Sequence, residues 1–175
     1  LPGTVKSLAD AQSDGGNVEV VYSVAQAVDL CQRVYDWGWH LQVQFDLSMG
    51  DFGLIQSLRR AVRLPLVIDH MGRLNPGTED HPVLGMLADG ECWIKLSAPY
   101  RVSHAGLPYQ DLQALVTKLV QCNPSQLVWG SDWPHTQFED SQTYDLQMSS
   151  LNTLTNDPVL TKKILSINPK SLYWP

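Results

Sequence analysis

Four short apolar segments recur along this 175-residue chain and constrain its fold more than any other feature. They begin near residues 40, 65, 92 and 126, so successive segments are 25 to 34 residues apart. That interval is the size of a strand–helix–strand unit, in which a helical crossover makes neighbouring strands parallel. The sequence therefore predicts an α/β fold with a parallel sheet.

The segments between the predicted strands carry apolar residues at helical spacing. Ser23, Asp51 and Asp80 are the expected helix N-caps, because short polar side chains accept hydrogen bonds from the first turn. The N-terminal stretch before residue 18 is expected to be a loop, and Asn168-Pro169 a final turn. We expect strands at 18–22, 40–46, 64–68, 92–97 and 126–131, and helices at 23–38, 51–62, 80–90, 108–121, 144–154 and 157–165.

Composition and charge exclude several classes of function. The formal net charge of −6 disfavours nonspecific binding to nucleic acid or anionic membranes, and no run approaches the ~18 apolar residues of a membrane helix. Three cysteines without CxxC spacing suggest neither a zinc knuckle nor a disulfide framework, so a reducing cytoplasm is the expected location. Self-association into a homo-oligomer stays open.

The predicted strands end in residues that can carry chemistry. Leu127-Val128-Trp129 runs into Asp132 and His135 within the sequence WGSDWPH, the strand before it leads to Arg101, and an earlier one ends at His70. The carboxyl ends of parallel strands form the edge where α/β enzymes bind substrates. An acid, a base and a cation are therefore expected at one edge of the sheet.

Each of these residues also has a structural explanation. Asp132 is a general base, a metal ligand or the N-cap of the following turn, and His70 is functional or a satisfied core histidine. Arg101 binds a carboxylate or lies in a surface loop, while His135 orients a substrate or bonds a backbone carbonyl. Strand alternation turns Asp69 to the opposite side as a structural partner.

Other catalytic signatures have no support in this sequence. Lys95 has no assigned role, and neither Ser97 nor Ser131 has an identifiable base partner that would make it a nucleophile. The HExxH, GxSxG and glycine-rich phosphate-binding patterns are absent. The chain is therefore not predicted to be a zincin, an α/β-hydrolase or a nucleotide-binding protein.

Taken together, five segments resemble the amidohydrolase superfamily, and within it the 2-pyrone-4,6-dicarboxylate lactonase-like TIM-barrel hydrolases. In order they are GWHLQVQFD (38–46), PLVIDHMGR (65–73), WIKLSAPYR (93–101), WGSDWPH (129–135) and NPKSLYW (168–174). The resemblance implies a (β/α)8 barrel that opens a carboxylated lactone, without a metal or other cofactor. It assigns water activation to Asp132, the scissile carbonyl to His70, and substrate contacts to Arg101 and His135.

The chain departs from this family pattern in two ways. The His-x-His pair of the family's first strand is missing, and 175 residues fall short of the about 250 of a typical closed barrel. We therefore expect residues 1–175 to be one domain, the C-terminal portion of an N-terminally incomplete barrel. A metal-dependent amidohydrolase or decarboxylase and a noncatalytic truncated remnant are the alternative functions.

Overall fold

The computed structural model describes residues 4–5, 24–50 and 52–174. Its centre is a parallel sheet with the strand order β1-β2-β3-β4-β5, so that each strand pairs with its neighbour in sequence. The strands are β1 (Thr4–Val5), β2 (His40–Val43), β3 (Leu66–Ile68), β4 (Trp93–Leu96) and β5 (Leu127–Trp129).

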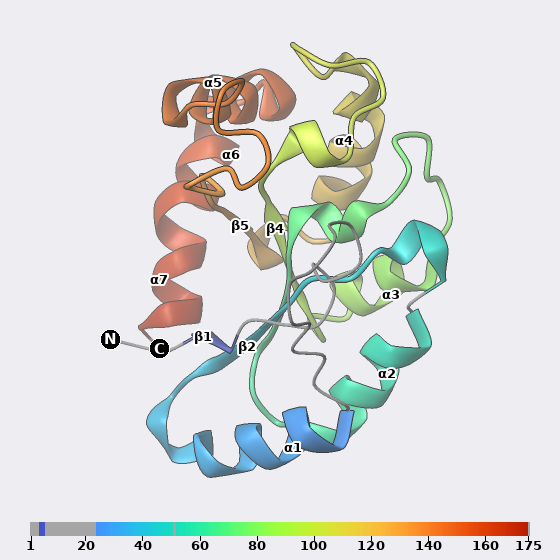
Figure 1. The fold of residues 1–175 in the computed structure, drawn as a ribbon, viewed down its shortest axis with the longest axis vertical. Coiled ribbons are helices and arrows are strands. Elements are labelled where there is room, and N and C mark those ends of the chain that lie inside the picture. Colours follow the sequence, from blue (N-terminus) through green and yellow to red (C-terminus); the bar gives the residue numbers. More distant parts are fainter. Residues whose placement is uncertain (1–3, 6–23, 51, 175) are drawn as a thin grey trace.

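Helices connect and flank these strands (Figure 1). In this view α1 to α4 follow one another along the lower and right-hand side of the sheet, whereas α5 to α7 stand beside β5. The helices are α1 (Val24–Arg33), α2 (Phe52–Ala61), α3 (Pro82–Ala88), α4 (Gln113–Cys122), α5 (Tyr144–Thr155), α6 (Pro158–Lys162) and α7 (Asn168–Tyr173).

The predicted α/β class is confirmed, and strands form in the predicted segments beginning near residues 40, 65, 92 and 126. The predicted helices also form, with Gly38 ending the first helical region in a left-handed conformation at φ 66°. The strand predicted at 18–22 and the caps predicted at Ser23 and Asp51 lie outside the described residues.

Three local predictions were wrong. Thr4–Val5 is a strand within the expected loop, because it pairs in parallel with the start of β2. The N-cap of α3 is His81 rather than Asp80, since His81 Nδ1 accepts a hydrogen bond from the Val83 amide at 3.2 Å. Asn168-Pro169 opens helix α7 instead of a turn.

The last helical region is continuous through a π-helical turn at Lys163–Ile167. A π turn accommodates an extra residue and shifts the hydrogen-bond pattern. Pro169, which has no amide hydrogen to donate, therefore fits within the first turn of α7. This is why a sequence signal that usually ends a helix does not end one here.

Alternation along the strands separates two apolar clusters. Side chains such as Ile68 and Ile94 enter the large core that the surrounding helices cover. Val67 and Val128 point the other way and form a smaller cluster with Leu172 of α7. Apolar side chains thus pack on both faces of the sheet, and the polar residues of the candidate site lie at its carboxyl end.

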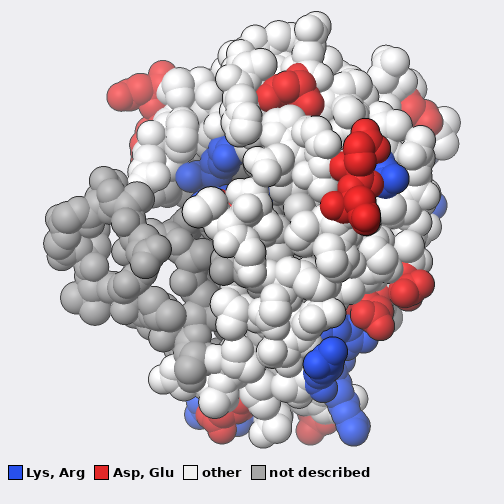
Figure 2. Space-filling view, turned by 90° about the vertical axis from the view of Figure 1, so that its right-hand side faces the viewer, with Lys and Arg blue, Asp and Glu red and all other residues white. Residues whose placement is uncertain are grey.

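The molecular surface on the face shown in Figure 2 is mostly uncharged. Lys and Arg side chains form one small group near the bottom of this view and isolated spots elsewhere. Among the helices that the structure describes, none is both long and apolar enough to cross a membrane.

Candidate active site

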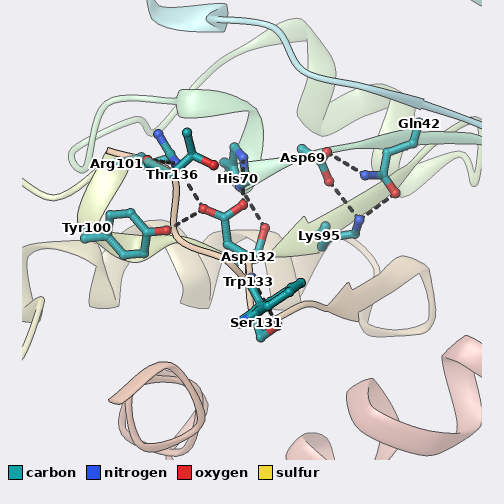
Figure 3. Close-up of polar contacts among 11 residues, drawn as sticks. Gln42, Asp69, His70, Lys95, Tyr100, Arg101, Ser131, Asp132, Trp133 and Thr136 are labelled. Atoms are coloured by element: carbon teal, nitrogen blue, oxygen red, sulfur yellow. Dashed lines mark hydrogen bonds and ion pairs between the residues drawn. The ribbon is translucent and has the colours of Figure 1, made fainter. Parts of the chain in front are cut away.

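Asp132, His70 and Arg101 meet at the carboxyl edge of the sheet, although they follow three different strands (Figure 3). Arg101 Nε donates a hydrogen bond to Asp132 Oδ2 at 2.9 Å. His70 Nε2 lies 3.7 Å from the other carboxylate oxygen, Oδ1. The sequence prediction that these three residues share one edge of the sheet is therefore confirmed.

Tyr100 is a fourth member of this group that the sequence analysis missed. Its hydroxyl donates to Asp132 Oδ2 at 2.5 Å. The residue precedes Arg101 in the 3-10 turn Pro99–Arg101, and both side chains reach the same oxygen. Its position next to Arg101 was the only sequence signal that could have indicated a role for Tyr100. A tyrosine beside an arginine in a loop does not by itself indicate a functional site.

The surroundings of Asp132 favour its ionised form. Burial alone would raise the pKa of this carboxyl, but His70, Tyr100 and Arg101 together outweigh burial and hold the pKa below its usual value. Tyr100 and Arg101 both donate to Oδ2, whereas Oδ1 faces Nε2 of His70. Asp132 is thus a carboxylate with one oxygen held and the other turned toward the imidazole.

His70 is buried, with 5% of its surface exposed. Burial lowers its pKa, and the nearby Asp69 and Asp132 carboxylates oppose this only in part, so the ring is neutral at neutral pH. Its Nδ1 lies 2.9 Å from the hydroxyl oxygen of Ser97. The sequence-based statement that Ser97 has no base partner was therefore wrong, because β3 and β4 pair side by side and bring the two residues together.

Arg101 is held by more than the carboxylate. Its Nη2 donates to the backbone carbonyl of Thr136 at 2.8 Å, and its guanidinium lies 5.3 and 5.2 Å from the ring centres of Tyr100 and Phe138. Such contacts fix the direction of the guanidinium plane. Arg101 therefore links the loop after β4 to the loop after β5.

His135 is the fourth residue singled out from the sequence, and it lies in the same loop as Asp132. Its backbone amide bonds to the Asp132 carbonyl at 2.7 Å, and only 4% of the residue is exposed. The ring centre is 6.3 Å from that of Tyr100. Within the described part of the chain, its buried Nδ1 has no hydrogen-bond partner, so the ring keeps an unused polar atom next to the site.

A second polar group lies beside the first (Figure 3). Lys95 Nζ is 2.9 Å from Asp69 Oδ1 and donates to Gln42 Oε1 at 2.6 Å, while Gln42 Nε2 donates to Asp69 Oδ2 at 2.7 Å. Gly130 makes room for the lysine, because a Cβ there would lie 3.1 Å from Lys95 Cδ. Asp69 is thus the counterion of Lys95, and its purely structural role stays a prediction.

A glycine shapes the turn that carries His70. Gly72 has a φ of 67°, and a Cβ at this position would lie 2.6 Å from Leu47 Cδ1. A side chain would therefore meet both an unfavourable backbone conformation and a core leucine. The glycine lets the 3-10 turn His70–Arg73 fold closely against the core below the imidazole.

Among residues 4–5, 24–50 and 52–174, no group of three or more His, Cys, Asp or Glu side chains is arranged to hold a metal ion. Tyr100 and the Arg101 guanidinium both donate to Asp132 Oδ2, and His70 Nε2 lies 3.7 Å from Oδ1. The polar contacts of this carboxylate are hydrogen bonds and an ion pair.

This protein places a carboxylate, an imidazole and a guanidinium at the carboxyl edge of a parallel sheet. In α/β enzymes this edge is where substrates bind. The family model described as "Amidohydrolase" matches residues 17–174. The chain therefore belongs to the amidohydrolase family.

Individual relatives are lactone enzymes at moderate to low identity. The chain is 33% identical over 165 residues to a 4-sulfomuconolactone hydrolase of Rhizobium radiobacter, covering 86% of this chain and 54% of the relative. It is 27% identical to a 2-pyrone-4,6-dicarboxylate hydrolase of Comamonas testosteroni (86% and 53% covered) and 29% identical to a D-galactarolactone isomerase of Agrobacterium fabrum (91% and 55% covered).

The fold comparison agrees with the family. A solved structure assigned as a 2-pyrone-4,6-dicarboxylic acid hydrolase from Pseudomonas putida superimposes with a TM-score of 0.73 at 23% identity, covering 98% of this chain and 62% of the other. The likeness shows a shared fold. The chain spans about half the length of the curated relatives that it matches.

Proposed function

We propose that this chain carries the catalytic edge of a hydrolase that opens the ring of a small carboxylated lactone. One observation carries the proposal: Asp132 meets His70, Tyr100 and Arg101 at the carboxyl ends of adjacent parallel strands. A carboxylate kept ionised beside a neutral imidazole and a guanidinium suits proton abstraction from water and stabilisation of an oxyanion. The lactone enzymes among the relatives support this choice of substrate.

The proposed reaction assigns different work to the two oxygens of Asp132. Tyr100 and Arg101 hold Oδ2, so Oδ1 takes a proton from water as the water oxygen bonds to the lactone carbonyl carbon. His70 donates a hydrogen bond from Nε2 to the carbonyl oxygen, which becomes negative. The carbonyl–ring oxygen bond then breaks, and the ring oxygen receives the proton that Asp132 took.

The substrate carboxylate is assigned to Arg101 and His135. Arg101 presents a planar donor group, and His135 has a buried Nδ1 next to the same loop. A carboxylate on Arg101 would compete with Asp132 for the guanidinium, which would make Asp132 a stronger base once substrate is bound. The reaction is written without a metal or other cofactor, as the resemblance implies.

We further propose that residues 1–175 are one domain and that the five parallel strands form part of a (β/α)8 barrel of the amidohydrolase type. In such barrels the active site is built from loops at the carboxyl ends of the strands, where Asp132 and His70 lie here. The substrate is expected to be a small molecule.

Replacing Asp132 tests the proposal directly. Asp132→Asn keeps the shape of the side chain but cannot accept the proton, so kcat for hydrolysis of 2-pyrone-4,6-dicarboxylate or 4-sulfomuconolactone should fall by at least about a hundredfold. The measurement is the initial rate of ring opening, followed by the loss of lactone absorbance.

The matched control is Asp140→Asn, which makes the same chemical change at an exposed carboxylate of the loop after the site. It should keep the parent rate. Full turnover by Asp132→Asn, with its circular dichroism spectrum unchanged, would rule out Asp132 as the base.

A further inference from the structure

Ser97 lies directly behind the imidazole of His70. It follows the last residue of β4, its amide donates to the Lys95 carbonyl at 3.0 Å, and its hydroxyl oxygen is 2.9 Å from His70 Nδ1. Only 1% of Ser97 is exposed, compared with 5% of His70. The hydroxyl therefore faces the ring from the interior of the protein, on the side opposite to Asp132.

Burial excludes the simplest role for such a serine. A hydroxyl, an imidazole and a carboxylate in series resemble a nucleophilic triad, in which the serine attacks the substrate. Attack requires the oxygen to reach an acyl carbon, but Ser97 is 1% exposed and its hydroxyl is buried against Nδ1 of the ring. The function of this hydroxyl must therefore be exerted through the ring.

A neutral imidazole carries one N–H, and its two nitrogens have different neighbours here. With the hydrogen on Nδ1, the lone pair of Nε2 would point at a carboxylate oxygen 3.7 Å away, and like partial charges would repel. With the hydrogen on Nε2, the positive N–H faces the carboxylate, and Ser97 donates its own hydrogen to Nδ1. A serine hydroxyl can donate or accept, but the second arrangement satisfies both sides of the ring.

We propose that Ser97 is a positioning residue that holds His70 in the tautomer protonated on Nε2. The consequence for catalysis rests on the proposed function: a neutral His70 in this tautomer offers an N–H to the lactone carbonyl and leaves proton abstraction to Asp132. Without the Ser97 donor, only the Asp132 carboxylate favours this tautomer, so the fraction of His70 able to donate at Nε2 falls.

The test reads the tautomer directly, in the absence of substrate. The protein is labelled with 15N-histidine, and two-bond 1H–15N correlations are recorded at pH 7.5, with His70 assigned by its loss in His70→Gln. The parent protein should show a protonated Nε2 and an unprotonated Nδ1. Ser97→Ala should raise the share of the Nδ1–H form, and Ser97→Thr, which keeps the hydroxyl, should restore the parent pattern.

Kinetics provide the second readout. Loss of a residue that orients a functional histidine typically costs about ten- to a hundredfold in activity, so kcat for lactone opening should fall by that factor in Ser97→Ala. The KM should change less, because Ser97 is not expected to touch the substrate. Ser150→Ala is the matched control: it removes another buried hydroxyl, bonded to the Leu146 carbonyl on α5, and should leave the His70 signals unchanged.

Two outcomes would overturn the proposal. One is a parent spectrum with His70 protonated on Nδ1 or on both nitrogens. The other is a Ser97→Ala protein whose His70 tautomer and kcat match those of the parent. If instead the tautomer responds as expected while no lactone is turned over, the positioning role stands and the proposed function fails.

Discussion

At the scale of single residues, the candidate site is built on unusual backbone. His70, Asp132 and His135 have positive φ angles of 52°, 59° and 63°. For residues with a Cβ, this left-handed conformation costs roughly 1 kcal/mol each, although Asp and His tolerate it better than most. Such conformations persist where surrounding contacts enforce them, and they gather at functional sites. Three residues of the proposed reaction are therefore among those with this strained backbone.

Tyr100 offers a prediction at this scale. Tyr100→Phe removes a hydrogen bond that stabilises the Asp132 carboxylate, so the pKa of Asp132 should rise. The acid limb of the kcat/KM profile should move to higher pH by the same amount. Carboxyl 13C signals followed through an acid titration, with Asp132 assigned by Asp132→Asn, measure the change without any substrate.

Tyr144→Phe is the comparison for that variant, since Tyr144 is exposed and its ring packs on Trp129. Tyr144→Phe should leave the pKa of Asp132 unchanged. An Asp132 pKa that does not respond to Tyr100→Phe would show that the hydroxyl does not bond to the carboxylate in solution.

At the scale of elements, the site depends on strands that end together. Strand β3 runs into the 3-10 turn His70–Arg73, β4 into the turn Pro99–Arg101, and β5 into the loop that holds Asp132. Parallel pairing aligns these ends, because every strand of the sheet points the same way. Short turns then hold the functional side chains close to the rigid sheet.

A buried asparagine helps to anchor the C-terminal helical region to this sheet. Asn168 at the start of α7 is 2% exposed, and its Nδ2 donates to the carbonyls of Pro124 at 2.8 Å and Leu127 at 2.6 Å. The amide thus ties α7 to the beginning of β5. Asn168, the first residue of the NPKSLYW segment, therefore has a structural role.

Asn168→Ala should lower the free energy of unfolding by about 2 kcal/mol, because two buried carbonyl groups lose their donor. Urea denaturation at neutral pH gives the difference. Asn152→Ala, at an exposed position of α5, should change stability by less than roughly 0.5 kcal/mol. Equal stability of the two variants would mean that water replaces the Asn168 amide without cost.

At the scale of the whole molecule, two buried histidines couple folding to pH. Burial, reinforced by the Lys95 charge, lowers the pKa of His40 to about 4. Burial also lowers the pKa of His70. Both rings are neutral in the folded protein over a range in which an unfolded chain would protonate them.

The sign of the effect follows from these directions. Above pH 6.5, the ordinary pKa of histidine, His40 is mostly neutral in both the folded and the unfolded chain. As pH falls from 6.5 toward about 4, His40 binds a proton in the unfolded chain but stays neutral in the folded protein. Stability should therefore decrease on acidification, by about 2 kcal/mol for His40 between pH 7.5 and pH 5. Urea denaturation at pH 7.5 and pH 5 measures it.

His40→Asn cannot titrate and should show a smaller difference between the two pH values, whatever its absolute stability. A parent protein that is more stable at pH 5 than at pH 7.5 would contradict the prediction, since it would require a folded state that takes up more protons than the unfolded chain.

Much of the fold could be predicted from local pattern. Apolar runs such as the one ending at Ile68 and the helical spacing between them set the class of fold and the order of elements. The exceptions have causes that local pattern does not reveal. Thr4–Val5 is a strand because it pairs with β2, and the last helical region reaches Asn168 through the π turn Lys163–Ile167.

That Asp132, His70 and Arg101 follow parallel strands could be read from local pattern, and this places them at one edge because the ends of parallel strands align. Which atoms meet depends on the folded chain: Tyr100 and Arg101 contact one oxygen of Asp132, and Ser97 lies behind His70. Those contacts join residues up to 32 positions apart, and such distances depend on packing and turn geometry rather than on periodicity.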